Sequence, residues 1–240
     1  MRPKNIQVHL VRPDSPQQLR ARVFHLRYKV YVEEMGLDIG GDAVGGLSDS
    51  ADERAISFLA ELEGEDVGTL RVVGIRDQPL ELFGQSEVWR QKVLEIAYDR
   101  ESYCEVGRFM VSRQRRATNV AMRLINTALK WAVSEGYCEA FIAARKGRLF
   151  DYYKNYYRGV PLSQDSTSYW INGRIVGEYY LMRFDLGKAR SFKRFRITSY
   201  YKALEFYVTF LRRQRRLRRP RGHPVPQKIT ASESKPLLRL

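Results

Sequence analysis

Apolar residues recur along the first part of the chain at two spacings, alternate positions for strands and every third or fourth position for helices. The pattern begins with a strand over Ile6–Val11. It continues with a helix to about Glu34, for which Asp14 and Ser15 supply the expected cap. Gly36 ends this helix. The glycine-rich stretch that follows is too irregular for a helix or strand, so we expect either a lid or a disordered connection there.

Strands and helices then alternate along the remainder of this region. The order predicts a mixed α/β sheet flanked by helices. The predicted elements are strands over Ala55–Leu62 and Val67–Ile75, a helix over Glu81–Tyr98, a strand over Cys104–Val111, a helix that ends at Glu135, a strand over Ala140–Ala144, a helix over Leu149–Tyr157, and strands over Ser168–Ile171 and Ile175–Asp185.

The charge of the chain is divided unevenly. The formal net charge is +15, yet residues 1–187 contain 26 basic and 25 acidic residues, whereas residues 188–240 contain 16 and 2. A near-neutral body with a basic tail favours an enzyme with an attached docking or membrane segment over a body that binds nucleic acid. We therefore expect a folded domain over 1–187, a basic amphipathic helix over 188–219 and a disordered tail over 220–240.

The cysteine content and the length of the apolar runs indicate the cellular compartment in which the protein is expected. Cys104 and Cys138 are the two cysteines of the chain, and their spacing fits no metal site, which favours a reducing compartment. The first residues lack the apolar core of a signal peptide. No apolar run reaches the ~18 residues needed to span a bilayer. We expect a cytoplasmic protein without a bound metal, with the tail as a means of attachment to the inner face of the cell membrane.

A basic turn separates the predicted strand over Cys104–Val111 from the helix after it. The first amides of a helix lack partners within the helix, and the aligned peptide dipoles place partial positive charge there. Arginines at such a junction favour a bound phosphate, although a solvated basic turn without a ligand remains the alternative. The phosphate-binding candidates are Arg113, Arg115, Arg116, Thr118 and Asn119.

Four short motifs occur in order along the body. They are Arg27-x-x-Val30-Tyr31, Asp49-x-x-Asp52, Gly68-x-x-Arg71 and Glu105-x-x-Arg108-Phe109. Together with the strand, basic turn and helix, they resemble the GNAT acyltransferases over about residues 6–186. Within that group they are similar to the acyl-homoserine-lactone (autoinducer) synthases and the N-acyl amino acid synthases.

This resemblance implies a GNAT-like acyl-CoA N-acyltransferase fold with a mixed central β-sheet flanked by helices. It also implies that the protein moves a fatty acyl group from an acyl thioester to the amine of an amino acid or a similar small molecule. The donor substrate would be acyl carrier protein (acyl-ACP) or coenzyme A (acyl-CoA) bearing the acyl group, and no cofactor would be bound permanently.

Two positions depart from the lactone synthases. Leu37 stands where those enzymes usually have tryptophan, and Leu47 stands where they have glutamate. Both positions concern substrate recognition, so we favour the N-acyl amino acid synthases and keep the lactone synthases as the alternative. An alternative of another class is a basic binding protein that keeps the GNAT fold without catalysis. The near-neutral body, which offers no basic groove, argues against it.

Glu105 is the candidate catalytic base. An amine must lose a proton to attack a thioester, so a proton acceptor is required within hydrogen-bond reach, directly or through one water. The structural alternative is a salt bridge with Arg71 or Arg108, because buried carboxylates usually require such partners. The two roles can coexist in one side chain.

Gly107 lies between Glu105 and Arg108, which strand alternation would place on opposite faces of the sheet. A glycine inside a strand often marks a bulge, which adds one residue and returns both side chains to the same face. A bulge would also expose amides that could bind the oxyanion of the reacting thioester. The backbone candidates for this contact are Phe109, Met110 and Val111.

The arginines and aspartates of the motifs form a second candidate set. A guanidinium suits a bidentate contact with a carboxylate, so this set could hold the carboxylate or the ammonium of an amino acid. A purely structural network that fastens the first helix to the sheet is the alternative. The set comprises Arg27, Asp49, Asp52, Arg71 and Arg108.

Four tyrosines lie in the predicted helix over Leu149–Tyr157. The resemblance to the GNAT enzymes implies that Tyr153 or Tyr156 protonates the departing thiolate. Packing is the alternative for a helix this rich in tyrosine.

The tail combines a basic run with an apolar face over residues 198–219. An anionic membrane surface would attract it at ~1 kcal/mol per basic residue, and an acidic acyl carrier protein would complement its charge. Nucleic acid, bound without sequence preference, ranks third. The membrane ranks first because an apolar, aromatic face serves a lipid interface and is unnecessary for binding phosphates.

Overall fold

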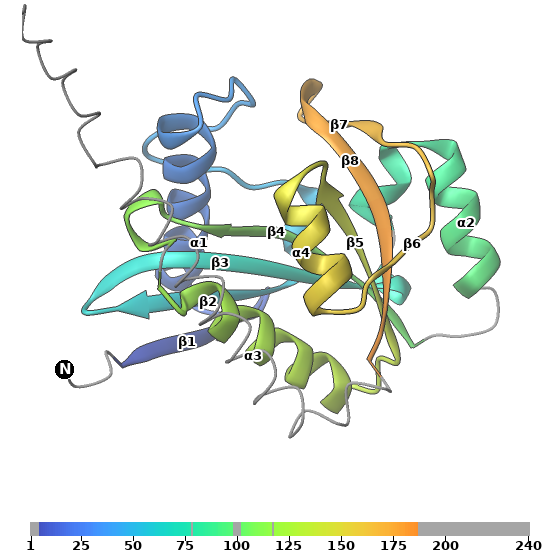
Figure 1. The fold of residues 1–240 in the computed structure, drawn as a ribbon. Helices are drawn as coiled ribbons and strands as arrows, with labels where there is room; N and C mark the ends of the chain where they lie inside the picture. Colours follow the sequence, from blue (N-terminus) through green and yellow to red (C-terminus); the bar gives the residue numbers. More distant parts are fainter. Residues whose placement is uncertain (1–4, 78, 98–101, 117, 187–240) are drawn as a thin grey trace, which may run out of the picture. The chain divides into compact units, whose positions relative to one another are not determined.

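The computed structural model describes residues 5–77, 79–97, 102–116 and 118–186, apart from the side chain of Tyr156. In this part the chain forms an eight-stranded sheet with four α-helices (Figure 1). The strands are β1 (Ile6–Val11), β2 (Ile56–Leu62), β3 (Glu65–Gly74), β4 (Tyr103–Val111), β5 (Glu139–Arg145), β6 (Val160–Pro161), β7 (Thr167–Ile171) and β8 (Arg174–Asp185). The helices are α1 (Gln17–Tyr28), α2 (Glu87–Ala97), α3 (Val120–Ser134) and α4 (Arg148–Tyr156).

The order of strands in the sheet is β1-β2-β3-β4-β5-β8-β6, and β7 pairs with β8 outside this path. The β4–β5 pair is parallel and the other described pairs are antiparallel. This is the mixed sheet that the sequence predicts. The sequence pattern did not reveal β6, which has only two residues.

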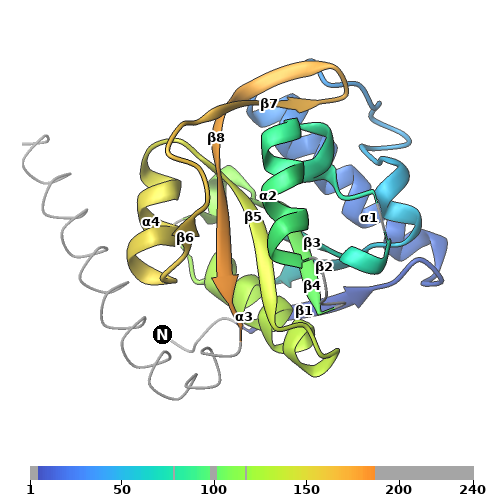
Figure 2. The ribbon, with the colours of Figure 1, turned by 90° about the vertical axis from the view of Figure 1, so that its right-hand side faces the viewer.

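Helices cover both faces of the sheet because side chains alternate along each strand. On β4, Cys104 and Val106 pack into the core that contains α3 and residues of α4. Tyr103 points the other way, into the core that contains α2. Figure 2 shows α4 and α2 on opposite sides of β5 and β8. Glu105 has the same parity as Tyr103, so its side chain belongs to the face of α1 and α2.

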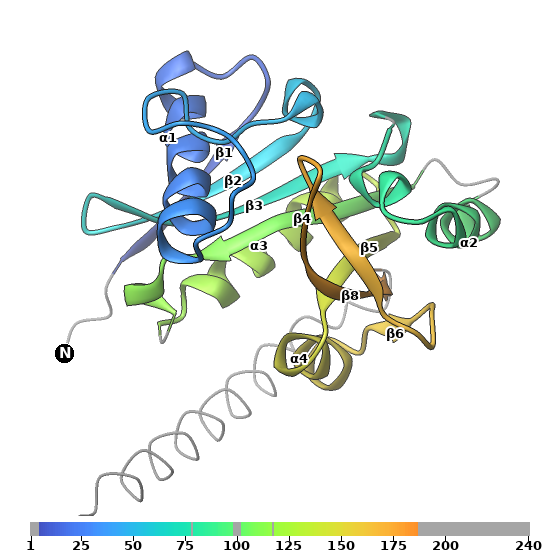
Figure 3. The same cartoon turned by 90° about the horizontal axis from the view of Figure 1, so that it is seen from above.

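The β4–β5 pair is unusually short. It extends only over Tyr103–Glu105 on β4 and Glu139–Phe141 on β5, after which β4 continues beside β3 and β5 beside β8. Figure 3 shows the two strands diverging beyond this point. The sheet therefore separates between β4 and β5 beyond Glu105 and Phe141.

A bulge lies in β4, as the sequence predicts. The β3–β4 register pairs Arg71 with Gly107 and Thr69 with Met110, so that two residues of β4 oppose one of β3. The residue with left-handed backbone is Arg108, at φ 47°, rather than the neighbouring glycine. The extra residue directs Arg108 to the same face as Arg71, where the two share partners.

The first helix reaches Glu34 as predicted, but in two parts. After α1, the turns of η1 (Lys29–Glu34) have π-helical hydrogen bonds, and Gly36 follows with φ 69°. The predicted cap is wrong. Pro16 occupies the cap position without a side-chain bond, because the hydroxyl of Ser15 instead accepts from the amide of Arg12 at 2.9 Å.

The predicted helix over Glu81–Tyr98 is wrong in its first part. Residues Glu81–Gly84 form a short 3-10 turn, η4, and α2 begins at Glu87. Glycine weakens a helix by about 1 kcal/mol relative to alanine, and Ser86 is of a type preferred at helix starts, so a break at this point is reasonable. The break leaves Glu81 on a turn beside the sheet.

The predicted helix over 188–219 and the tail over 220–240 lie outside the described residues. Within the part of the chain that the structure describes, no helix combines the length and the apolar composition needed to cross a membrane.

Candidate active site

Asp49 caps a 3-10 turn, η2 (Ser50–Glu53), and Asp52 lies within it, so that the turn holds both carboxylates in place. Asp49 accepts from the amide of Ala51 at 3.0 Å, and Asp52 accepts from the amide of Asp49 at 2.9 Å. This reciprocal arrangement is a capping box, which satisfies amides that the short turn cannot satisfy itself. The Asp-x-x-Asp motif therefore has a local structural cause, and it presents both carboxylates to the sheet.

Arg27 and Asp52 form the buried end of the charged cluster. Nη1 of Arg27 lies 2.8 Å from both carboxylate oxygens of Asp52, and Nη2 donates to Ser57 Oγ at 3.1 Å. The side chains of Arg27 and Asp52 are 1% and 4% exposed. This pair joins α1 to the sheet and has almost no access to a substrate, which agrees with the structural alternative for these two residues.

Arg71, Arg108 and Asp49 form the other end of the cluster. Arg71 Nη1 donates to Asp49 Oδ1 at 2.6 Å, and Arg108 Nη2 donates to Asp49 Oδ2 at 2.8 Å. Burial by itself would raise the pKa of Asp49, but the two guanidinium groups outweigh it and lower this pKa to about 2. Asp49 is thus held as a carboxylate. Its side chain is 22% exposed, so this end of the cluster is open to a ligand.

Glu81, which the sequence reasoning missed, joins the same cluster from η4. Its Oε2 accepts from Arg71 Nη2 at 2.7 Å, and its Oε1 lies 3.1 Å from Arg108 Nη2. Little in the sequence indicates this role, because the apolar spacing over Glu81–Tyr98 predicts a helix. Gly84 and Ser86 were the available signals for a separate turn.

Glu105 lies beside these groups and is only 1% exposed. Its Oε2 accepts from the amide of Leu82 at 3.2 Å. Burial, together with the negative charge of Glu81, raises the pKa of Glu105 to about 8, against the opposing effect of Arg71 and Arg108. A carboxylate with such a pKa is a stronger base than an ordinary glutamate and can accept a proton near neutral pH.

Three tyrosines from separate elements border the cluster. Tyr31 comes from η1, while Tyr169 and Tyr179 stack at 4.7 Å between ring centroids on β7 and β8. Burial and the charges of Glu81 and Glu105 raise the pKa of Tyr169 well above its usual value, and burial raises that of Tyr179 to about 12. These phenols therefore stay neutral and supply hydroxyl groups and ring surface beside the carboxylates.

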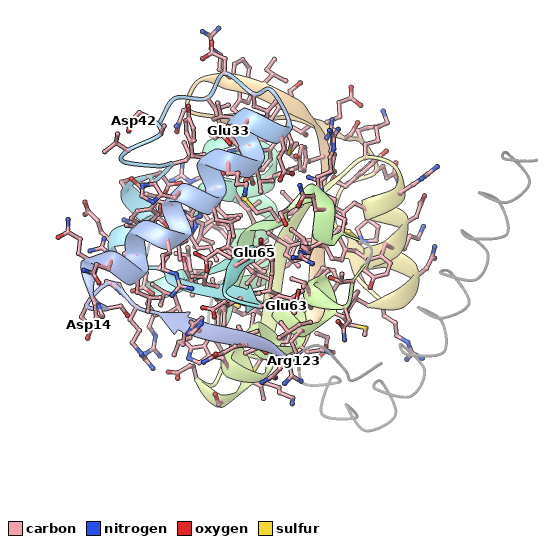
Figure 4. All side chains as sticks on the ribbon, turned by 90° about the vertical axis from the view of Figure 1, so that its left-hand side faces the viewer. Asp14, Glu33, Asp42, Glu63, Glu65 and Arg123 are labelled. Carbon is pink, nitrogen blue, oxygen red and sulfur yellow. The ribbon has the colours of Figure 1, made fainter. Side chains whose placement is uncertain are left out.

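The basic turn that follows β4 is held by the carboxylates of Glu34 and Glu65. The amide of Arg113 donates to Glu34 Oε2 at 2.8 Å, and Arg116 Nη2 lies 3.3 Å from the same atom. Arg115 Nη2 donates to Glu65 Oε2 at 2.7 Å. Figure 4 labels Glu65 and Glu63 at the hairpin between β2 and β3, seen past α1.

Thr118 and Asn119 lead from this turn into α3. Thr118 Oγ1 donates to the carbonyl of Arg115 at 2.6 Å, and Asn119 occupies the cap position without a side-chain bond. A groove of about 390 Å³ lies on the α1 side of the turn. Its lining includes Arg22, Lys29, Glu34, Ser112, Gln114 and Arg115.

Tyr153 is buried on α4, in the core on the α3 side of the sheet. Its ring lies 5.9 Å from that of Phe184 and 6.1 Å from that of Tyr157, between centroids. Burial raises its pKa above the usual value. Glu105 belongs to the opposite face, so the structure does not bring these two side chains together. The side chain of Tyr156 lies outside the described part.

Comparison with known proteins identifies the family. A family model described as N-acyl amino acid synthase FeeM matches residues 22–169, which is more than half of the chain. A search of curated proteins finds no match.

Solved structures share the fold. FeeM, an N-acyl amino acid synthase from uncultured soil microbes, aligns with a TM-score of 0.60 at 13% identity and covers 78% of this chain and 94% of its own. The CoA-dependent acyl-homoserine lactone synthase MesI aligns with a TM-score of 0.58 at 19% identity, covering 75% and 89%. An acyl-CoA N-acyltransferase from Pseudomonas aeruginosa gives 0.51 at 18% identity, covering 75% and 99%. The fold is therefore GNAT-like, and the family match leads to the conclusion that the chain belongs to the N-acyl amino acid synthase FeeM family of acyltransferases.

Proposed function

We propose that the protein transfers a fatty acyl group from an acyl thioester to the amine of an amino acid, with Glu105 as the base. The observation that carries this proposal is a buried carboxylate of raised pKa next to the point where β4 and β5 separate. The amine nitrogen attacks the thioester carbonyl, a C–N bond forms and the C–S bond breaks. Glu105 accepts the proton of the amine, and the departing thiolate takes up a proton to leave as a thiol.

The acceptor is proposed to bind at the open end of the charged cluster. Arg108 offers a guanidinium to a substrate carboxylate, and its Nε and Nη1 are buried without a hydrogen-bond partner in the described part of the chain. Asp49, kept ionised by Arg71 and Arg108, offers a carboxylate to an ammonium group. Arg27 and Asp52 hold α1 against the sheet and shape the site from behind.

The donor is proposed to extend from the separation of β4 and β5 toward the basic turn. The backbone of Phe109, Met110 and Val111, next to the bulge, is the candidate for contact with the oxyanion. Exposed ion pairs contribute only about 0–1 kcal/mol, so the arginines of the turn can exchange Glu34 and Glu65 for a phosphate. The residues proposed to bind that phosphate are Arg113, Arg115, Arg116, Thr118 and Asn119.

Protonation of the thiolate is proposed for Tyr153 or Tyr156. Tyr153 is a neutral phenol at physiological pH and so carries a proton that it can give, although burial raises its pKa and makes it a weaker acid. It would have to act through the separation between β4 and β5, since it packs on the opposite face of the sheet from Glu105.

An amino acid is favoured over the sulfonium substrate of a lactone synthase. Leu47, which stands where lactone synthases have glutamate, is only 4% exposed and packs in the core with Ile39. Leu37 is packed against the same core. Apolar side chains at both positions remove groups that would recognise a charged acceptor, and the family match supports the same branch.

The experiment is a matrix of donors and acceptors. Purified protein is incubated with acyl-CoA or acyl carrier protein as donor and with the twenty amino acids or S-adenosylmethionine as acceptor, and products are identified by mass spectrometry. We expect N-acyl amino acids that are absent when Glu105→Gln replaces the wild type. Acyl-homoserine lactone as the main product would establish the alternative activity instead.

Partners of the tail are proposed from sequence alone. Residues 198–219 combine arginines with apolar positions, a combination suited to an anionic membrane surface. We expect full-length protein to co-sediment with anionic vesicles, less so at high salt, and a chain that ends at Gly187 to lose this binding while it keeps acyl transfer to a soluble amine. Loss of activity with acyl carrier protein alone would instead identify the tail as a docking segment for that donor.

A further inference from the structure

Glu81 bridges Arg71 and Arg108, the two arginines whose charges act on the candidate base. One carboxylate oxygen accepts from Arg71 at 2.7 Å and the other lies 3.1 Å from Arg108. Both oxygens are therefore engaged by positive charge. The side chain is 12% exposed, which makes these contacts far better shielded than surface ion pairs.

Glu105 lies beside the same arginines without forming an ion pair with either one in the described structure. In the described structure the amide of Leu82, the residue that follows Glu81, donates a hydrogen bond to Glu105 Oε2. A Cβ built on Gly107 would lie 3.5 Å from Glu105 Oε1 and 3.8 Å from Glu81 Oε2, so the two carboxylates converge on one patch of β4. One short turn thus supplies both the carboxylate that occupies the arginines and the amide that orients Glu105.

We propose that Glu81 is a positioning residue for the acyl transfer, because its carboxylate occupies the guanidinium groups of Arg71 and Arg108 and so leaves Glu105 free to act as the base. This proposal rests on the proposed function. The two carboxylates have the same chemistry, and the division of roles between them comes from their surroundings. The Glu81 carboxylate lies between two guanidinium groups. Glu105 forms an ion pair with neither of them in the described structure, and burial favours its protonated form.

The ionisation of Glu105 depends on every charged or titratable group that faces it. Glu81 raises its pKa, while Arg71, Arg108 and the amide of Leu82 lower it, and burial makes the largest contribution. The charge of Glu105 in turn raises the pKa of two neighbouring groups, the thiol of Cys104 on the same strand and the phenol of Tyr169 on β7.

Removing the charge of Glu81 should release both arginines to stabilise the Glu105 carboxylate. An uncompensated positive charge at this range lowers the pKa of a carboxylate by about one to three units. In Glu81→Gln the acid limb of the kcat/KM profile therefore moves to lower pH by about one to three units. The plateau of kcat falls as well, because a carboxylate of lower pKa is a weaker base.

The activity test compares wild type, Glu81→Gln, Glu81→Asp and the control Glu87→Gln, with one acyl-CoA donor and one amino acid acceptor. Glu87 is an exposed glutamate at the start of α2, so its variant should match the wild-type profile. Glu81→Asp keeps the charge on a shorter side chain and should shift the limb less than Glu81→Gln. Because the acceptor is the same throughout, its own ionisation cancels in the comparison. An unshifted limb in both Glu81 variants would overturn the proposal.

A second measurement requires no substrate. Since the pKa of Glu105 is raised on folding, its neutral form stabilises the fold below about pH 4.5, and this contribution is lost as pH rises toward 8. The pH dependence of unfolding is measured by urea denaturation for wild type, Glu105→Gln, Glu81→Gln and the double variant. The change caused by Glu105→Gln should become smaller when Glu81 is already glutamine.

The two measurements separate the proposals. An unchanged Glu105→Gln effect in the Glu81→Gln background would overturn the role of Glu81, whatever the activity. If urea denaturation shows coupling between Glu81 and Glu105 but the protein shows no acyl transfer, the electrostatic role of Glu81 is supported and the proposed function is rejected. If Glu81→Gln does not fold, the same double-variant cycle is measured with Glu81→Asp. The coupling between Glu105→Gln and Glu81→Asp should be smaller than that with Glu81→Gln. No coupling at all would count against the proposal.

Discussion

The arginines near the bulge of β4 and those of the basic turn that follows this strand are held in different ways. Near the bulge, Arg71 and Arg108 lie in a cluster with side chains that are 1% and 7% exposed. In the turn, the side chains of Arg115 and Arg116 are 23% and 49% exposed, and they pair with Glu65 and Glu34. Ion pairs that are shielded from water cost several kcal/mol to break, whereas exposed ones contribute little. Between residues 108 and 116, the bulge end therefore has fixed charges, and the turn end has arginines that can exchange partners for a ligand.

The largest effect is expected at the fixed end. Glu105→Gln should retain the fold but lower turnover by roughly 10²–10⁴, the usual loss for a positioned base. Steady-state kinetics with acyl-CoA and an amino acid will measure it. Glu139→Gln is the matched control, since Glu139 is also buried and lies on the adjacent strand, where it pairs with Arg183. It should alter stability more than turnover. Similar turnover in wild type and Glu105→Gln would show Glu105 to be structural.

The next effect concerns the stability of the cluster. Asp52→Asn should lower the free energy of unfolding by about 3–5 kcal/mol, because it leaves the buried guanidinium of Arg27 without its counter-charge. Urea denaturation will measure this loss. Glu65→Gln, which breaks an exposed pair with Arg115, should cost at most about 1 kcal/mol. Equal losses would remove the contrast between the two ends.

A smaller effect is expected at the exchangeable end. Replacing Arg115 and Arg116 together by glutamate should weaken the binding of the acyl-CoA donor about 10- to 100-fold. This is the loss expected when charge-assisted hydrogen bonds worth about 1.5–3 kcal/mol are removed. KM should rise for acyl-CoA and stay the same for an acyl thioester of N-acetylcysteamine, which lacks phosphate. Unchanged KM for acyl-CoA in a folded variant would place the phosphate elsewhere.

The smallest effect is a pH dependence. Because the pKa of Asp49 is lowered from 3.8 to about 2 on folding, its carboxylate stabilises the protein above pH 3.8, and this contribution disappears as pH falls toward 2. Asp49→Asn should therefore flatten the acid limb of the stability profile. Asp38→Asn, at an exposed position, should leave that limb in place. Thermal denaturation between pH 2 and 5 will detect the difference. The free energy of unfolding should change by about 1 kcal/mol for each unit of pKa shift.

Periodicity was sufficient to predict most of the sheet and helices, because apolar spacing reflects burial. The strand over Ile6–Val11 and the β7–β8 hairpin around Asn172 follow directly from it. It failed at Glu81–Tyr98, where Leu82, Trp89 and Val93 have helical spacing but belong to two separate elements. Spacing alone does not distinguish one helix from a turn followed by a helix.

The candidate site was partly predictable for a related reason. Residue type and motif order pointed to Arg27, Asp49 and Arg108, whose contacts the structure shows. The partnership of Glu81 with Arg71 was not predictable, because it depends on where η4 places a side chain after a loop. The bulge was predictable from Gly107, but the sequence did not indicate that its neighbour Arg108 adopts the left-handed backbone.

The short pairing between β4 and β5 has a consequence for aggregation. Beyond Glu105 and Phe141, each strand has a side on which the described structure shows no neighbouring strand. Unpaired strand edges usually lie at the outside of a sheet, where they can pair with other molecules and must be blocked. Here the edges lie in the middle of the sheet, where helices on both faces restrict the approach of another molecule. The backbone groups of these inner edges are therefore less accessible to neighbouring molecules than those of an outer edge strand such as β1.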